Sequence, residues 1–232
     1  MMIFISSFII LMIAPASLFI MGDKAKFEKS TYKKETANSY WKVRWDKGLN
    51  GEYLTVNELD KMKQHFKVLI NIYLPNRRGG TSEIDVVLLH RTGIYVLESK
   101  NYSGWIFGRE EDKKWCQSLP NGKKTFFYNP IKQNETHIRA LQQALPDVDQ
   151  SLFRSIIVFS ERCELKKIQL QSLDIKVLKR NKLRNYLKMN KGKQLSVKEM
   201  ETIYQQLKSY TNVPSQLRIR HIEEIRQRYK VK

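Results

Sequence analysis

Apolar runs separated by short polar turns cover most of the chain, and their spacing predicts an α/β fold. Residues 66–74 alternate and are rich in Val, Ile and Tyr, which is typical of a strand. Two apolar runs at 84–89 and 94–97 are joined by a tight turn at 91–93, a pattern that predicts a hairpin. Because both arms are apolar on both faces, we expect them at the centre of a sheet that helices cover.

Helical signals lie on either side of this hairpin. Residues 51–65 place apolar side chains at spacings of three, and residues 129–145 open with Asn129-Pro130, where proline fits the first helical turn. Ser196 and Glu199 form a capping-box pattern that predicts another helix, and Pro214 begins a last one. Further short strands are expected at residues 104–107, 113–117, 155–159 and 175–178. The expected architecture is a mixed central sheet flanked by helices.

The N-terminal segment has the features of a membrane anchor. Residues 1–21 carry no charged side chain, and at about 1.5 Å per residue a helix of this length spans roughly 30 Å. A cleaved signal peptide is the alternative, but it needs basic residues before the apolar run, whereas here the lysines begin afterwards at Lys24. Because basic residues stay on the cytoplasmic side, we expect a single-pass protein, N-out, with a cytoplasmic globular part.

The balance of charged residues indicates what kind of partner the chain binds. Lys and Arg number 42 and Asp and Glu 23, so the formal net charge is 42 − 23 = +19. Such a charge predicts an acidic partner, either nucleic acid or an anionic membrane surface. Residues 22–47 are expected to form a basic juxtamembrane linker that can contact anionic lipid headgroups. Residues 161–232 are expected to form a basic, α-rich extension that completes or flanks the core. Two cysteines exclude a disulfide framework and a four-thiolate zinc site.

Candidate chemistry lies on the hairpin. Asp85 stands inside an otherwise apolar strand, where a charge is costly unless something compensates it. Glu98 and Lys100 are two residues apart on the other arm and share a face, and the turn can bring Asp85 beside Glu98. Carboxylate oxygens of this kind suit Mg²⁺, and a lysine stabilises developing negative charge. The set can hydrolyse a phosphodiester with a metal-activated water.

Each of these residues also has a simpler explanation. An isolated Glu-x-Lys is common and is typical of a surface ion pair, and Glu52 at a helix start is explained by the helix dipole. His137 alone is more often structural than catalytic. Asp85 is harder to explain in this way because its neighbours predict burial.

At these positions the chain resembles the nuclease-related domain family, NERD, over roughly residues 48–160. The resemblance implies a restriction-endonuclease-like core of the PD-(D/E)xK type that uses Mg²⁺ or Mn²⁺. It implies that Glu52, Asp85 and Glu98 hold the metal and that Lys100 acts with them in catalysis. Gln133 resembles a glutamine near the DNA backbone or the metal, and Lys132 and His137 are expected to bind substrate beside it. The matching residues are Gly51-Glu52, Ser82 to Asp85, Gly93 to Gly104, Asn129-Pro130, Gln133-Asn134 and His137.

Two functions remain open at this point. The first is a membrane-anchored, divalent-metal-dependent nuclease that cuts DNA with little sequence specificity. The second is a non-catalytic module that holds nucleic acid at the membrane, and a lipid-binding scaffold is a weaker third. The clustered carboxylates favour the enzyme, because a pure binder does not need groups that repel phosphate. The form of the nucleic acid and the oligomeric state are not indicated by the sequence.

Overall fold

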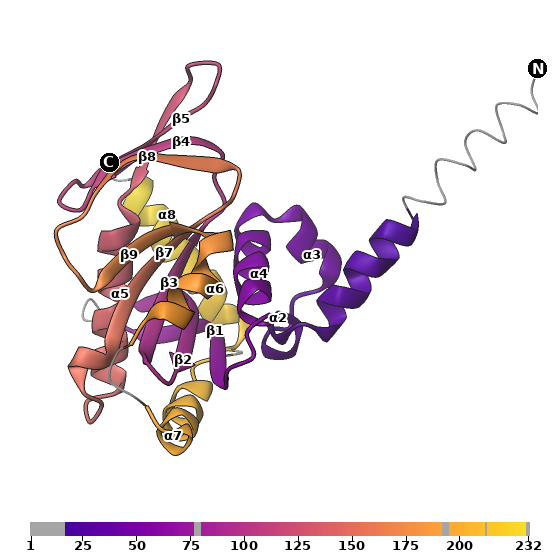
Figure 1. Cartoon of the computed structure of the whole chain (residues 1–232), viewed down its shortest axis with the longest axis vertical. Helices are drawn as coiled ribbons and strands as arrows, with labels where there is room; N and C mark the ends of the chain where they lie inside the picture. Colours follow the sequence, from indigo (N-terminus) through magenta and orange to yellow (C-terminus); the bar gives the residue numbers. More distant parts are fainter. Residues whose placement is uncertain (1–16, 77–79, 192–194, 212, 231–232) are drawn as a thin grey trace, which may run out of the picture.

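Two β-sheets and their surrounding helices make up the structure, a computed structural model that describes residues 17–76, 80–191, 195–211 and 213–230 (Figure 1). The main sheet has the strand order β1-β2-β3-β7-β9. Its first three strands run antiparallel, and β3, β7 and β9 run parallel. The mixed sheet and its internal hairpin are therefore confirmed. The strands are β1 (Phe66–Pro75), β2 (Thr81–His90), β3 (Gly93–Lys100), β7 (Phe153–Phe159) and β9 (Ile175–Lys179).

A second sheet, with the order β6-β5-β4-β8, lies beside the first and was not expected. Trp115 of this sheet stacks on Phe159 of the main sheet with the ring centroids 6.1 Å apart. Two of its strands, β6 and β8, were missed because most of their side chains are exposed or half-buried and give no apolar alternation. The strands are β4 (Gly104–Arg109), β5 (Lys114–Ser118), β6 (Lys124–Tyr128) and β8 (Cys163–Gln169).

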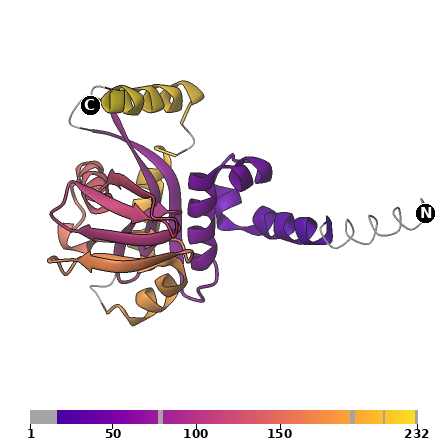
Figure 2. The same ribbon diagram turned by 90° about the horizontal axis from the view of Figure 1, so that it is seen from above.

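Helices cover both faces of the main sheet (Figures 1 and 2). One face packs against α4 (Lys47–Leu59) and α6 (Arg180–Met189), and the other against α5 (Pro130–Ala144) and α7 (Val197–Lys208). A short 3₁₀ turn, η1 (Gln150–Leu152), precedes β7, and α8 (Ser215–Lys230) lies against β2. The region after residue 160 supplies a strand to each sheet, and the core is incomplete without it.

Local capping accounts for where these helices begin. Asn129 accepts a hydrogen bond from the backbone of Ile131 at the start of α5, with Pro130 in the first turn. Ser196 and Glu199 form the expected capping box of α7. The helix expected at 51–65 instead begins at Lys47, because the Asp46 carboxylate accepts from the first backbone amides, and it ends at Leu59.

Residues 22–47, expected as a linker, are folded onto the domain. Residues 17–29 are helical and are followed by α2 (Thr31–Glu35) and α3 (Tyr40–Trp45). Phe27, Tyr32 and Tyr40 are buried, and the Phe27 ring lies edge-on to Tyr53 of α4 at 5.3 Å. Aromatic side chains of this size bury enough apolar surface to hold a lysine-rich segment in place. The lysines therefore lie around a packed aromatic cluster.

Within the described part of the chain, no helix has both the length and the apolar character needed to cross a membrane. The predicted anchor at residues 1–21 falls for the most part on residues 1–16, which lie outside the described residues.

Asn134 attaches α5 to the sheet, which leads to a first prediction. Its buried Nδ2 donates to Val96 O and to Ser155 Oγ, both at 2.8 Å. Asn134→Ala removes both buried hydrogen bonds, so the free energy of unfolding should fall by about 2 kcal/mol in urea denaturation. Asn185→Ala, an exposed change on α6, is the control and should stay within roughly 0.5 kcal/mol of the parent. Equal effects of the two changes would contradict the attachment.

Candidate active site

The strands β2 and β3 separate where the candidate carboxylates lie. Their pairing ends at Val86 and Leu97, one residue before Asp85 and Glu98 would meet. Asp85 Oδ2 accepts a hydrogen bond from the backbone amide of Ser99 at 3.1 Å, in the place of a carbonyl from β2. Next to Asp85 on the other side, Asn71 of β1 has a left-handed φ of 53°. In both β1 and β2, the side chains that flank this point two residues apart pack on opposite faces of the sheet. The Asp85 carboxylate is therefore directed to the carboxyl end of β3.

Glu98 and Lys100 face α5. Lys100 Nζ lies 2.7 Å from Glu98 Oε1 and donates to Gln133 Oε1 at 3.1 Å. His137, one turn further along α5, places Nε2 at 3.3 Å from the second Glu98 oxygen. Glu98 is only 1% exposed. Four of the predicted residues, from β3 and α5, are therefore brought together in one cluster, in which Glu98 and His137 are buried and Lys100 and Gln133 are half-buried.

Glu52 approaches from the α4 side. Its Oε2 accepts a hydrogen bond from the Tyr32 hydroxyl at 3.3 Å, and Tyr32 in turn accepts from Asn38 Nδ2 at 3.2 Å. The Tyr32 and Asn38 contacts were not predicted. The sequence contains one indication of these contacts, an aromatic residue within the lysine-rich segment that was expected to be a linker.

Burial, together with nearby like charges, raises two pKa values in this site. Burial, and then the negative charge of Glu98, raise the pKa of Asp85 to about 7, although Lys100 and His137 oppose the change. Burial, and then the charges of Asp85 and Glu83, raise the pKa of Glu52 well above its ordinary value. Glu52 and Asp85 therefore repel each other electrostatically, although they come from different elements.

The ion pair of Glu98 and Lys100 shifts in the opposite sense. Burial alone would raise the pKa of Glu98, but the charges of Lys100 and His137 outweigh it and hold that pKa below its ordinary value. Burial alone would lower the pKa of Lys100, but the carboxylates of Glu98 and Asp85 outweigh it and raise that pKa. Near neutral pH, Glu98 is a carboxylate and Lys100 is an ammonium group.

The carboxylates fit a divalent cation in chemistry and in charge. Hard cations such as Mg²⁺ take carboxylate oxygens, and a positive charge at this point relieves the repulsion between Asp85, Glu98 and Glu52. Within the described residues, Glu98 Oε2 is buried without a hydrogen bond. Nowhere in the same residues do three His, Cys, Asp or Glu side chains lie close enough to hold a metal as they stand. A cation therefore has to draw the carboxylates together and to compete with Lys100 and His137 for Glu98.

Lys132 does not join this cluster. Burial raises the pKa of Glu110, but hydrogen bonds from Ser172 and Gln171 and the charge of Lys132 outweigh it and keep that pKa low. Lys132 therefore lies near Glu110, beside the second sheet. Gln133 and His137 are one helical turn apart on the face of α5 that meets β3. Lys132, which follows the fully buried Ile131, lies outside that pair.

Comparisons with known proteins identify the family of the chain. Residues 47–160 match the family described as NERD, nuclease-related domain. The chain is also 30% identical over 191 residues to an uncharacterized protein of Bacillus anthracis, pXO1-01. The aligned region covers 80% of this chain and 86% of that protein. No solved structure gives a significant match. The family match begins at the first residue of α4, ends just after β7 and contains Glu52, Asp85, Glu98, Lys100 and Gln133.

The raised pKa of Asp85, caused by burial and by the charge of Glu98, predicts how stability depends on pH. Because the folded state raises the pKa of Asp85 from 3.8 to about 7, folding takes up a proton, and stability falls as the pH rises between these values. Asp85→Asn removes this loss. Without metal, we expect the variant to melt on the order of 5 °C above the parent at pH 8 and much closer to it at pH 5, measured by circular dichroism.

Asp147→Asn, on an exposed loop, is the matched control and should leave Tm nearly unchanged at both pH values. A Tm difference for Asp85→Asn that is the same at pH 5 and pH 8 would show that Asp85 is not held protonated by its surroundings.

Proposed function

Because the chain belongs to the nuclease-related domain family, we propose that it is a divalent-metal-dependent nuclease that hydrolyses DNA phosphodiester bonds with little sequence specificity. One observation carries this proposal: Asp85, Glu98 and Lys100 converge where β2 and β3 separate, and Glu52 interacts with them from α4. We take the three strand residues as a PD-(D/E)xK set on a restriction-endonuclease-like core. A structural ion pair alone does not account for three carboxylates that repel one another.

The roles of the residues follow from their charges. Glu98, Asp85 and Glu52 would hold Mg²⁺, or Mn²⁺ in its place. When bound, the cation polarises a phosphoryl oxygen and makes a bound water more acidic. Lys100, kept as an ammonium group by its carboxylate neighbours, stabilises the negative charge that develops at phosphorus. Gln133 fixes the direction of the Lys100 side chain, and His137 sits against Glu98 on the same helix.

We also propose the membrane location. The uncharged run at residues 1–21 is followed by lysines, which favours a single-pass anchor with the globular part in the cytoplasm. Leu18, Phe19 and Met21, at the start of the helix at residues 17–29, are each more than two-thirds exposed, as is expected where a helix enters lipid.

A binding module without catalysis is the second candidate, and a specific observation favours it. Lys100 Nζ already pairs with one Glu98 oxygen, and His137 Nε2 lies 3.3 Å from the other, so both stand where a cation would have to bind. If this arrangement persists when nucleic acid binds, the chain holds its ligand through its net charge of +19 and does not cut it.

Cleavage assays separate the two candidates. The purified full-length chain should cut DNA with Mg²⁺ or Mn²⁺ and stop when EDTA is added. Lys100→Ala should lower the cleavage rate by about a hundredfold or more, because the charge at phosphorus is no longer stabilised. Glu98→Gln should lower it by at least as much.

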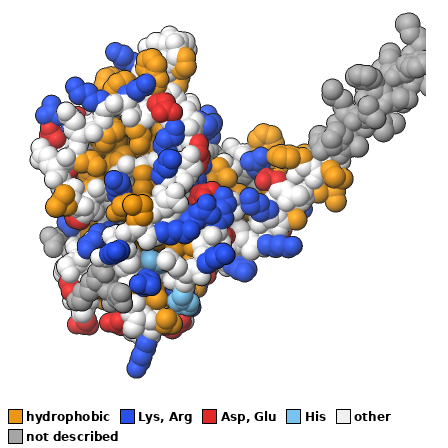
Figure 3. Space-filling view, viewed as in Figure 1, with side chains coloured by type: hydrophobic (Ala, Val, Ile, Leu, Met, Phe, Trp, Pro, Cys, Tyr) orange, Lys and Arg blue, Asp and Glu red, His pale blue; other side chains and the backbone are white. Residues whose placement is uncertain are grey.

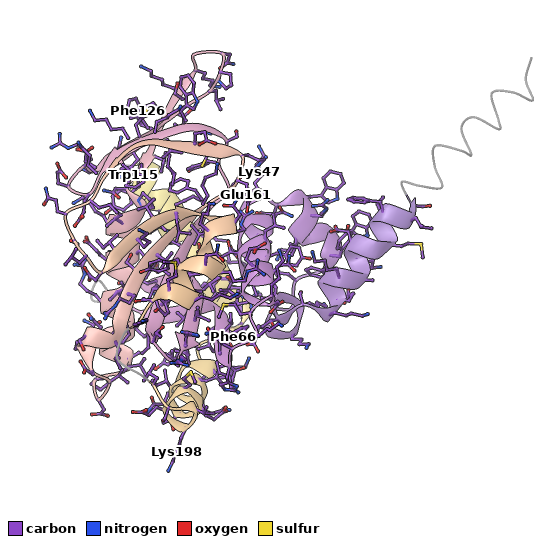
Figure 4. The ribbon with its side chains drawn as sticks, in the orientation of Figure 1. Lys47, Phe66, Trp115, Phe126, Glu161 and Lys198 are labelled. Atoms are coloured by element: carbon purple, nitrogen blue, oxygen red, sulfur yellow. The ribbon has the colours of Figure 1, made fainter. Side chains whose placement is uncertain are left out.

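Lys198→Ala, an exposed lysine on α7 at the far end of the molecule from β4 and β5, is the control and should cut at the parent rate (Figure 4). Cleavage that persists in Lys100→Ala would remove Lys100 from the mechanism. Salt-sensitive DNA binding with no cleavage under any metal would support the binding module instead.

A further inference from the structure

A second polar site adjoins the carboxylate cluster at the carboxyl ends of β3 and β7. It is a cavity of about 370 Å³ between α4, the segment after β7 and the start of α6. Asn101, in its wall, directly follows Lys100, and Ser160 directly follows β7. Figure 4 shows Lys47 and Glu161, which both line the cavity, side by side near the start of α4. Glu52 lies on the same helix, so α4 takes part in both sites.

One nitrogen of a buried guanidinium in the cavity wall has no hydrogen bond to the described residues. Arg180 is 3% exposed, and its Nη1 pairs with Glu161 at 2.9 Å while its Nε donates to Thr55 Oγ1 at 3.4 Å. Its Nη2 has no hydrogen bond to any described residue, and the same is true of Asn50 Nδ2 in the same wall. A buried donor without an acceptor is costly, and native proteins rarely leave one. Because both atoms are donors, the missing group is an acceptor.

The charge of the wall specifies the kind of acceptor. The lining side chains include four cations, Arg44, Lys47, Arg162 and Arg180, against one carboxylate, Glu161. Such a balance selects an anion, and the Nη2 group of Arg180 can donate to a phosphate oxygen. Figure 3 shows Lys and Arg side chains gathered on the face where the N-terminal helices meet the sheets.

We propose that this cavity binds a phosphate group of the nucleic-acid strand, next to the phosphate that is cut. The proposal rests on the proposed function and adds to it a second contact that sets where the strand lies. A cavity of 370 Å³ equals the liquid volume of about a dozen waters, which is enough for a phosphate with its sugar. Arg180 and Asn50 supply donors from the floor, and Lys47 and Arg162 supply charge at the rim. The phosphate is either the terminal one of a strand or an internal one.

Binding without cleavage tests this assignment. Fluorescence anisotropy in EDTA would measure the affinity of the full-length chain for a single-stranded oligonucleotide with a 5′-phosphate and for the same oligonucleotide with a 5′-hydroxyl. Lys47→Glu, an exposed change at the rim, should weaken binding about tenfold, because it removes one phosphate contact and adds repulsion. Lys198→Glu, with the same change in charge far from the cavity, should weaken it by less than about twofold. Arg180→Lys, which loses the Nη2 donor but keeps the charge, should also bind more weakly.

The two oligonucleotides identify the source of the phosphate. A preference for the 5′-phosphate that disappears in Lys47→Glu supports a terminal phosphate, and equal weakening for both supports an internal one. Inorganic phosphate should compete with either oligonucleotide in the parent and less well in Lys47→Glu. Equal weakening by Lys47→Glu and Lys198→Glu, together with no competition by phosphate, would overturn the proposal. If Arg180→Lys fails to fold, the affinity of Lys47→Glu still tests whether the cavity binds phosphate.

Failure of this inference can be distinguished from failure of the nuclease proposal. If the chain binds DNA through the cavity but never cuts it, the phosphate site is supported and the nuclease proposal is contradicted. If the chain cuts DNA with Mg²⁺ but Lys47→Glu does not change its affinity for DNA, the nuclease proposal is supported and the phosphate site is contradicted.

Discussion

The hydrogen bond from the Ser99 amide to the Asp85 carboxylate is the contact on which the site depends. It replaces a backbone contact at the point where β2 leaves β3, so the sheet can open there without leaving that amide unpaired. The opening directs Asp85 to the end of β3 that carries Glu98 and Lys100. The left-handed backbone of Asn71 lets β1 follow the same bend. A regular ladder would have continued past these residues and left no room for a substrate group.

The charges gathered at this opening cost stability. Asp85 and Glu52, both half-buried, each have a raised pKa because they are partly withdrawn from water and because other carboxylates are near. The Glu98–Lys100 pair compensates only part of that charge. Groups that exist for stability alone are usually arranged to attract one another. An arrangement that repels is typical of a site that binds a positive ligand, and the apolar sheet and its helices supply the free energy that tolerates it.

The parallel half of the main sheet explains why two polar sites lie together. The strands β3, β7 and β9 end at the same edge, and the residues that follow them are Asn101, Ser160 and Arg180. The side chains of these three residues line a cavity on the α4 side, while Glu98 and Lys100 face α5. Ligands of open α/β sheets bind at this kind of edge. The helix α4 closes the α4 side and brings Glu52 to the carboxylates.

The chain by itself determined the main sheet, its hairpin, the caps of α5 and α7 and the identity of the polar residues within apolar strands. These features depend on local periodicity and capping, which neighbouring residues specify. Only the tertiary structure decided that the charge of Asp85 acts on Glu52 and that Lys132 lies near Glu110. It also decided that Phe27, Tyr32 and Tyr40 are buried and that one nitrogen of Arg180, Nη2, has no hydrogen bond among the described residues. Each of these is a contact between residues far apart in the chain, and its energy depends on burial and on the approach of distant charges, which sequence spacing does not encode.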